Sequence, residues 1–230
     1  VGFKLCIGQP WQFMSIVKAM LQSQIVPDFI VVDGAEGGTG AAPLELINYM
    51  GTPLREGLLF VHNTLVGAGL RDQIKVGASG KIISAFDIAS TMAIGADWVN
   101  SARGFMFAVG CIQAQSCHTN LCPVGVATQD PDRQKALHVP SKALRVFNFH
   151  KNTLRGLSEL IAASGLCHPA DIKAHHLAQR INDREIKNYA QLHFWLNPGE
   201  LLHCENKDEE NFYFRMWNLA SADKDRKSHV

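Results

Sequence analysis

The sequence predicts an α/β protein built from successive β/α units. Four short apolar segments are each followed by apolar residues at helical spacing, and a glycine-rich or polar cluster follows three of the four segments directly. Strands that alternate with helices in this way favour right-handed crossovers and a parallel sheet. Four such units correspond to half of an eight-unit β/α barrel.

The four predicted strands are short and apolar, and they span residues 2–7, 29–33, 74–77 and 98–100. The second is an almost continuous apolar run, which is typical of strands buried in parallel sheets. The first helix is expected to begin near Pro10, because proline is favourable at the first helical position. Further helices are expected over residues 43–50 and 55–68, after Ser84, and from about Phe105 into a cysteine-rich loop.

Three segments are expected along the chain. Residues 1–130 should form the barrel part with the cysteine loop, residues 131–215 a helical extension, with 141–182 helical, and residues 216–230 a disordered polar tail. The chain opens on Val1 without a methionine, and its first residues already have the pattern of a strand. We therefore expect a piece of a longer polypeptide.

Composition excludes several classes of function. The chain has 230 residues and a formal net charge of +1, so it offers no electrostatic case for binding nucleic acid or anionic membranes. No apolar run reaches the ~20 residues that a membrane helix needs, and no signal peptide pattern opens the chain. The few, clustered cysteines indicate a reducing compartment, so we expect a cytoplasmic protein.

Cys111, Cys117 and Cys122 fall within twelve residues, at the spacing C-x5-C-x4-C. Three thiolates on a bent loop suit an iron–sulfur cluster. Two alternatives are a zinc site that adds His118 and a loop whose cysteines only pack in the core. Residues outside this loop that we expect to be plain core or surface groups are Cys6, Cys167, Cys204, His150, His175 and His176.

Other candidate site residues follow the predicted strands, where β/α barrels place their ligands. Residues 33–40 contain four glycines, which let the backbone approach a ligand closely; the alternative is a plain turn. Residues 77–81 and 100–104 are suited to a phosphate, with Lys81 and Arg103 adding charge; the alternative is two ordinary turns with solvated basic residues. Lys4 lies within an apolar strand, and a lysine there either faces water at the strand end or has a bound partner.

The cysteine spacing, His-Thr-Asn at 118–120 and Cys-Pro-Val-Gly-Val-Ala-Thr-Gln at 122–129 closely resemble the cluster loop of glutamate synthase large subunits and FMN-binding glutamate synthase-like proteins. The resemblance implies the second half of a (β/α)8 TIM-type barrel, with a [3Fe–4S] cluster on Cys111, Cys117 and Cys122. It also implies FMN-binding positions, at Lys4, Ser79, Gly80, Lys81, Asn100, Ser101, Ala102 and Arg103. The implied substrate loop contains Glu36, Gly37, Gly38 and Thr39.

Departures from the family pattern occur in these loops. Ala35-Glu36 replaces the His-Asp pair of glutamate synthases, so the carboxylate is kept and the imidazole is lost. The segments 80–81 and 100–103 are closer to the glutamate synthase-like branch than to the large subunits.

The resemblance implies an oxidoreductase that reduces an imine of 2-oxoglutarate and ammonia to glutamate. The ammonia can be glutamine-derived, and the implied electron donor is ferredoxin or a reductase subunit. The alternative is an inactive half-barrel whose cysteine loop binds zinc or no metal. Because a half-barrel leaves sheet edges unpaired, we expect the isolated chain to form a homo-oligomer. Because half of the barrel mouth is missing, we also expect the isolated chain to be inactive.

Overall fold

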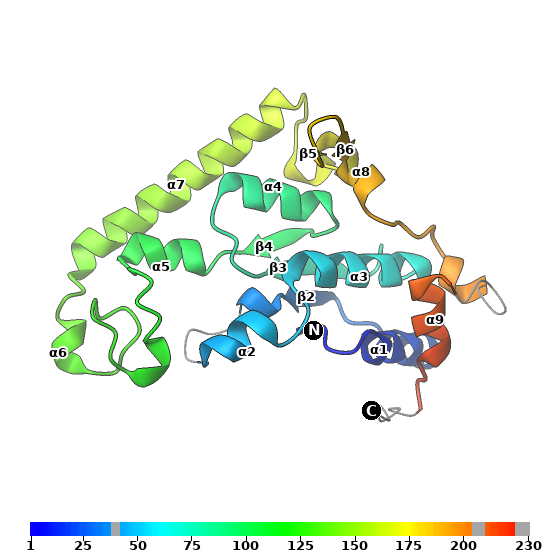
Figure 1. Ribbon diagram of the computed structural model, residues 1–230, viewed down its shortest axis with the longest axis horizontal. Coiled ribbons are helices and arrows are strands. Elements are labelled where there is room, and N and C mark those ends of the chain that lie inside the picture. Colours follow the sequence, from blue (N-terminus) through cyan, green and yellow to red (C-terminus); the bar gives the residue numbers. More distant parts are fainter. Residues whose placement is uncertain (38–41, 204–209, 224–230) are drawn as a thin grey trace.

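The computed structural model describes residues 1–37, 42–203 and 210–223, and its centre is a four-stranded parallel sheet (Figure 1). The strands are β1 (Gly2–Leu5), β2 (Phe29–Asp33), β3 (Lys75–Ser79) and β4 (Trp98–Asn100), and they pair in the order β1-β2-β3-β4. The predicted α/β class with a parallel sheet is confirmed. Its extension to half of a barrel stays a prediction.

The two faces of the sheet differ in chemistry. Residues in register on neighbouring parallel strands project to the same side, and the register joins Ile30 to Val76 and Val32 to Ala78. These four side chains are almost fully buried and form the core with two helices, α1 (Pro10–Ser23) and α3 (Leu54–Gly67). The opposite face, called the inner face below, ends in polar residues: Lys4, Asp33, Ser79 and Asn100.

The helices follow the strands nearly as predicted. α1 begins at Pro10, and α4 begins after Ser84, whose hydroxyl oxygen accepts a hydrogen bond from the backbone N–H of Asp87. The remaining α-helices of the described residues are α2 (Leu44–Tyr49), α4 (Ala85–Ala93), α5 (Arg103–Val109), α6 (Pro131–Gln134), α7 (Val139–Ala163), α8 (Tyr189–Leu192) and α9 (Phe212–Leu219). None of these described helices combines the length and the apolar composition needed to cross a bilayer.

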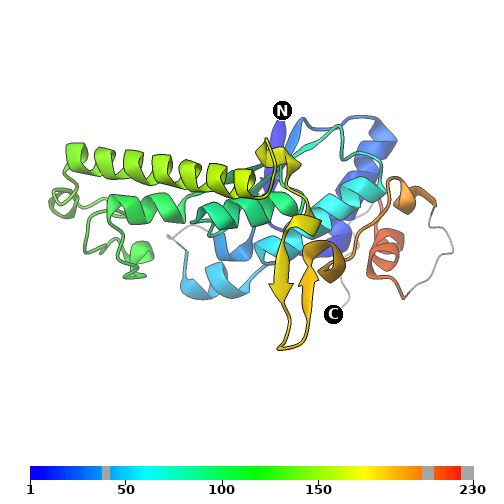
Figure 2. The ribbon, with the colours of Figure 1, turned by 90° about the horizontal axis from the view of Figure 1, so that it is seen from above.

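The long helix α7 packs along α5, the helix that leads into the cysteine loop, and along α4. It runs beside α5 and α4 in both views (Figures 1 and 2). Leu157 and Ile161 of α7 are buried against α4. At the other contact the ring of Phe149 packs edge-on to Phe105 at 5.2 Å. The loop that follows α5 is therefore positioned by a helix that lies later in the chain.

Two predictions about the C-terminal part were wrong. Residues 164–182 do not continue the α-helix: Gly165 (φ +72°) follows the end of α7, and only two 3₁₀ turns, Pro169–Asp171 and Ala174–His176, are helical there. An antiparallel hairpin of β5 (Ala178–Arg180) and β6 (Ile186–Asn188) comes next (Figure 2). The predicted disordered tail is ordered at its start, because α9 buries Met216 and Trp217 against α1. Residues 224–230 lie outside the described part of the chain.

Candidate functional site

A cleft of about 580 Å³ opens at the carboxyl ends of β3 and β4. One wall, called the strand-end wall, comes from the loops after the strands, and the other, called the cysteine wall, comes from residues 111–130. Nine predicted site residues line this one cleft: Glu36, Ser79, Gly80, Lys81, Asn100, Ala102, Arg103, Cys111 and Cys117. Segments predicted separately from the sequence thus meet in space.

The strand-end wall contains a turn with positive φ angles. Gly80 has φ +155°, and a Cβ there would lie 3.1 Å from the Cβ of Leu54. Lys81 follows in the left-handed region, with φ +48°. The Arg103 side chain makes no hydrogen bond or ion pair with any residue of the described part of the chain. Its guanidinium is therefore available to an anion in the cleft.

The N-terminus of α4 is closed by a capping box and lies outside the lining of the cleft. The Asp87 carboxylate accepts the backbone N–H groups of Ser84 at 2.8 Å and Ile83 at 3.1 Å. This carboxylate caps the start of the helix, and residues 83–87 do not line the cleft. An anion in the cleft would meet the backbone near Gly80 and the side chain of Arg103.

Three predicted site residues have other contacts. Both Glu36 oxygens accept the backbone N–H of Leu54, at 2.9 and 3.0 Å, so Glu36 lines the cleft while anchoring the first residue of α3. Ser101 donates to the carbonyl of Ile82 at 2.7 Å and does not line the cleft. Lys4 lies outside the lining too, in an ion pair with Asp33 at 2.6 Å.

The rest of the predicted substrate loop is only partly described. Gly37 ends a short 3₁₀ helix, Ala35–Gly37. Gly38 and Thr39 lie outside the described residues, so their predicted role remains a prediction.

The three clustered cysteines line one small cavity beside the main cleft. Cys111 and Cys117 border both cavities, whereas Cys122 is buried and borders only the small one. Burial raises the pKa of the Cys122 thiol, but hydrogen bonds from the backbone N–H groups of residues 124–127 outweigh burial and lower the pKa overall. This environment favours a thiolate, the form that binds metals.

The arrangement of the donors bears on the choice between zinc and a cluster. Within the described residues, no group of three or more His, Cys, Asp or Glu side chains is placed to hold a single metal ion. A zinc site needs its ligands around one ion, and His118 borders the main cleft whereas Cys122 does not. A cluster takes thiolates on separate irons, so its ligands can lie farther apart. The donor set is compatible with a cluster and does not favour zinc.

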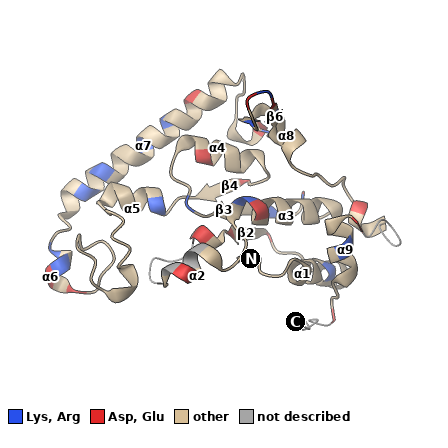
Figure 3. Cartoon of the chain, viewed as in Figure 1, with Lys and Arg blue, Asp and Glu red and all other residues tan. Residues whose placement is uncertain are grey.

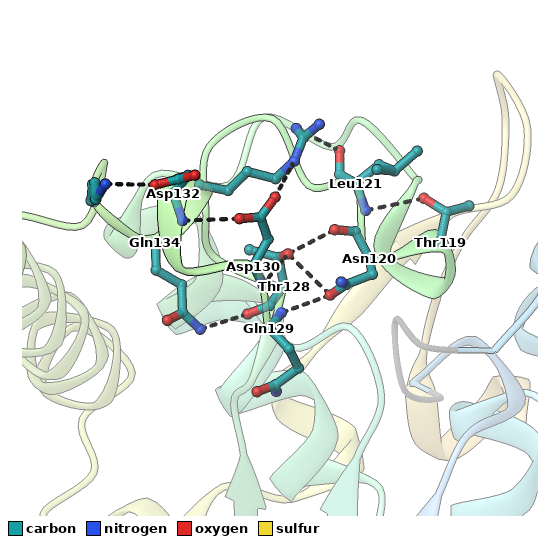
Figure 4. Close-up of polar contacts among 10 residues, drawn as sticks. Thr119, Asn120, Leu121, Thr128, Gln129, Asp130, Asp132 and Gln134 are labelled. Atoms are coloured by element: carbon teal, nitrogen blue, oxygen red, sulfur yellow. Dashed lines mark hydrogen bonds and ion pairs between the residues drawn. The ribbon is translucent and has the colours of Figure 1, made fainter.

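Asn120 holds the cysteine wall together, as Figure 4 shows. It adopts a left-handed conformation (φ 66°), which asparagine tolerates better than most residues. Its side-chain oxygen accepts the N–H of Gln129 at 2.7 Å, and the Thr128 hydroxyl donates to its carbonyl at 2.7 Å. Gln134 donates to the carbonyl of Thr128 at 2.8 Å. These bonds close the loop after Cys122.

Gly125 and an ion pair complete the loop. Gly125 has φ +74°, and a Cβ there would lie only 2.3 Å from the carbonyl oxygen of Arg133. The Arg133 guanidinium in turn lies 3.3 Å from the Asp130 carboxylate (Figure 4). Any side chain at position 125 would push these two segments apart.

Sequence reasoning missed some of the site. Asn120, Thr128 and Gln129 also line the cleft, although the sequence argument used them only to identify a motif. The signal that could have found them is the pairing of asparagine with threonine eight residues later on one loop. Of the isolated residues, Cys6 and Cys167 are exposed thiols, and Cys204 lies outside the described residues.

The polar loops gather at the carboxyl ends of the parallel strands, the edge at which α/β proteins commonly bind their ligands. A family model described as a conserved region in glutamate synthase matches residues 1–167. The chain belongs to the glutamate synthase family.

Individual relatives are longer than this chain. It is 46% identical over 192 residues to the glutamate synthase large subunit-like protein YerD of Bacillus subtilis, covering 84% of this chain and 37% of that protein. It is 36% identical to ferredoxin-dependent glutamate synthase 1 of Arabidopsis thaliana, covering 65% of this chain and 10% of that protein. It is 38% identical to the archaeal glutamate synthase [NADPH] of Methanocaldococcus jannaschii, covering 60% and 27%. The chain thus spans about a third or less of these relatives.

Proposed function

We propose that this chain is the FMN- and [3Fe–4S]-binding part of a glutamate synthase-like oxidoreductase, and that its sheet is the second half of a β/α barrel. The observation that carries the proposal is the shared cleft. Ser79–Lys81, Asn100 and Arg103, and two of the three clustered cysteines are separated in sequence yet border one cavity at the strand ends. Family membership supports the same proposal.

Different residues of the cleft would bind the two cofactors. Arg103 and the backbone at Gly80 would hold the FMN phosphate, because a guanidinium without a partner among the described residues and a glycine turn that lines the cleft suit a doubly charged oxyanion. Cys111, Cys117 and Cys122 would hold the cluster. The chemistry that FMN and the cluster supply when bound is electron transfer to an imine of 2-oxoglutarate and ammonia, giving glutamate.

The electron donor of the whole protein would be ferredoxin or a reductase subunit. The names of relatives include a ferredoxin-dependent and an NADPH enzyme, which supports both possibilities. A cytoplasmic location and self-association of the isolated chain belong to the same proposal.

Visible absorption of the full-length polypeptide tests the proposal. Flavin and iron–sulfur clusters are coloured and zinc is not, so anaerobic reconstitution should give bands of both groups. A colourless protein after reconstitution with FMN, iron and sulfide would contradict the proposal.

A comparison of FMN with riboflavin tests the phosphate site separately. A charge-assisted hydrogen bond contributes about 1.5–3 kcal/mol, so Arg103→Ala should weaken FMN ~10- to 100-fold and leave riboflavin nearly unchanged. Arg155, which is paired with Glu159 on the exposed side of α7, provides the control: Arg155→Ala should change neither affinity. Equal losses for both flavins would place the phosphate elsewhere.

A further inference from the structure

Asp33 is a carboxylate that lies beside the cleft; it opens the predicted loop 33–40, but the sequence assigned it no role of its own. It ends β2 and is in register with Ser79 of β3, which is itself in register with Asn100 of β4. In-register residues of parallel strands project to one side. Asp33 therefore belongs to the same polar row of the inner face as two residues that line the cleft.

Among the described residues, the carboxylate has one ion-pair partner. Oδ2 of Asp33 lies 2.6 Å from the Lys4 ammonium. Lys4 is in register with Val31, two residues before Asp33, so its side chain leans toward the carboxyl end of the sheet. The Lys4 side chain is 57% exposed and that of Asp33 only 19%. The aspartate is thus the anchored member of the pair, and the lysine is the one that could move.

Fold stability does not explain this aspartate. Its other oxygen, Oδ1, is buried without a hydrogen-bond partner in the described part of the chain. Leaving a buried carboxylate oxygen unpaired costs stability. Glu36, one turn later, shows the contrast, because both of its oxygens accept an N–H group. The contact that Asp33 does make, its ion pair with Lys4, suggests that its role is to position the lysine.

We propose that Asp33 is a positioning residue that holds the Lys4 ammonium at the edge of the cleft, facing an anionic group of the bound ligand. A lysine stem is flexible and its ammonium strongly hydrated, so without Asp33 the charge would move into solvent. The inference rests on the proposed function, under which the anionic group is the reduced flavin ring or a substrate carboxylate.

Midpoint potentials of FMN bound to the full-length polypeptide distinguish positioning from a bare charge effect. A nearby cation favours the reduced, anionic flavin, so Lys4→Met should lower the potential. If Asp33 acts through Lys4, Asp33→Asn should lower it too, and the double variant should be no lower than Lys4→Met alone. If Asp33 acted only as a negative charge, Asp33→Asn would raise the potential.

Controls and a second measurement separate the remaining outcomes. Glu185→Gln breaks an exposed ion pair with Lys187 on the β5–β6 hairpin and should not change the potential. Asp33→Glu keeps a carboxylate and should return the potential toward the wild-type value, which also serves if Asp33→Asn folds poorly. The Kd of 2-oxoglutarate is measured alongside: a roughly 10-fold or greater weakening in both Asp33→Asn and Lys4→Met, at unchanged potential, identifies the substrate carboxylate as the anion.

Two results would overturn the inference. One is a higher potential in Asp33→Asn, and the other is no change in either potential or 2-oxoglutarate affinity. A wild-type protein that binds no FMN would instead overturn the proposed function, and this inference with it.

Discussion

The two walls of the cleft are held by different forces. The strand-end wall rests on a large apolar core, in which Leu58, Val61 and Ile30 are fully buried. In the cysteine wall, residues 111–130, only Cys122, Gly125 and Thr128 are buried, and hydrogen bonds around Asn120 give the loop its shape. Burial of apolar surface stabilises the first wall whether or not a ligand is bound. The second depends on a few bonds and on whatever its thiolates bind.

The largest expected effect concerns the ligand of the cysteine wall. Cys117→Ser in the full-length polypeptide should abolish cluster binding, because a compact cluster held by three thiolates loses one iron ligand. Iron and sulfide analysis after anaerobic reconstitution measures this. Cys167→Ser, at an exposed thiol outside the loop, should keep full iron content. Full iron content in Cys117→Ser would contradict the assignment.

The next effect concerns the strand-end wall. Leu58→Ala leaves a cavity at a fully buried site on α3, so the free energy of unfolding should fall by about 2–5 kcal/mol. Leu144→Ala, at an exposed position of α7, should change it by less than ~0.5 kcal/mol. Denaturant titration compares the two variants. If Leu58→Ala lowered the free energy of unfolding only slightly, the apolar core would not be what stabilises this wall.

Acid should weaken the apolar core that supports the strand-end wall. Burial, and then the nearby Arg71 guanidinium, lower the pKa of His62 on α3 to about 4. The unfolded chain binds this proton from its ordinary pKa of about 6.5, so stability present above pH 6.5 is lost as the pH falls toward 4. The loss amounts to about 3 kcal/mol. Unfolding of His62→Gln, which cannot take up this proton, should depend less on pH over that range.

The spacing of apolar residues predicted the helices and strands that pack against the core, and it missed the elements that are mostly exposed. The limits of β2 and β4 and the start of α1 follow from apolar spacing and a proline, since these elements bury one face in the core. The hairpin β5–β6 was missed because three-residue strands with exposed side chains have little apolar alternation to detect. Helix α9 was cut short because its polar surroundings masked two buried residues, Met216 and Trp217.

Among the candidate site residues, type and spacing predicted groups that the structure brings to one cleft, but not the partners of those groups. Gly80 and Arg103 were singled out because they follow predicted strands, and the cysteines because they cluster within twelve residues. The capture of Glu36 by the Leu54 N–H and the pairing of Asp33 with Lys4 depend on how separate segments pack. No local pattern encodes such contacts.

The smallest effect tests whether single hydrogen bonds hold the cysteine wall. Thr128→Val keeps the shape of the buried side chain but removes the hydroxyl that bonds to Asn120 and accepts the Asp130 N–H. Such bonds contribute about 1 kcal/mol, so native-state proteolysis within residues 111–130 should become roughly 5-fold faster, with cleavage of the sheet unchanged. Gln129→Ala, whose side chain makes no hydrogen bond within the described residues, should cleave at the wild-type rate. If Thr128→Val is cleaved no faster than Gln129→Ala, the loop is held by something other than the Asn120 network, and the contrast between the two walls fails.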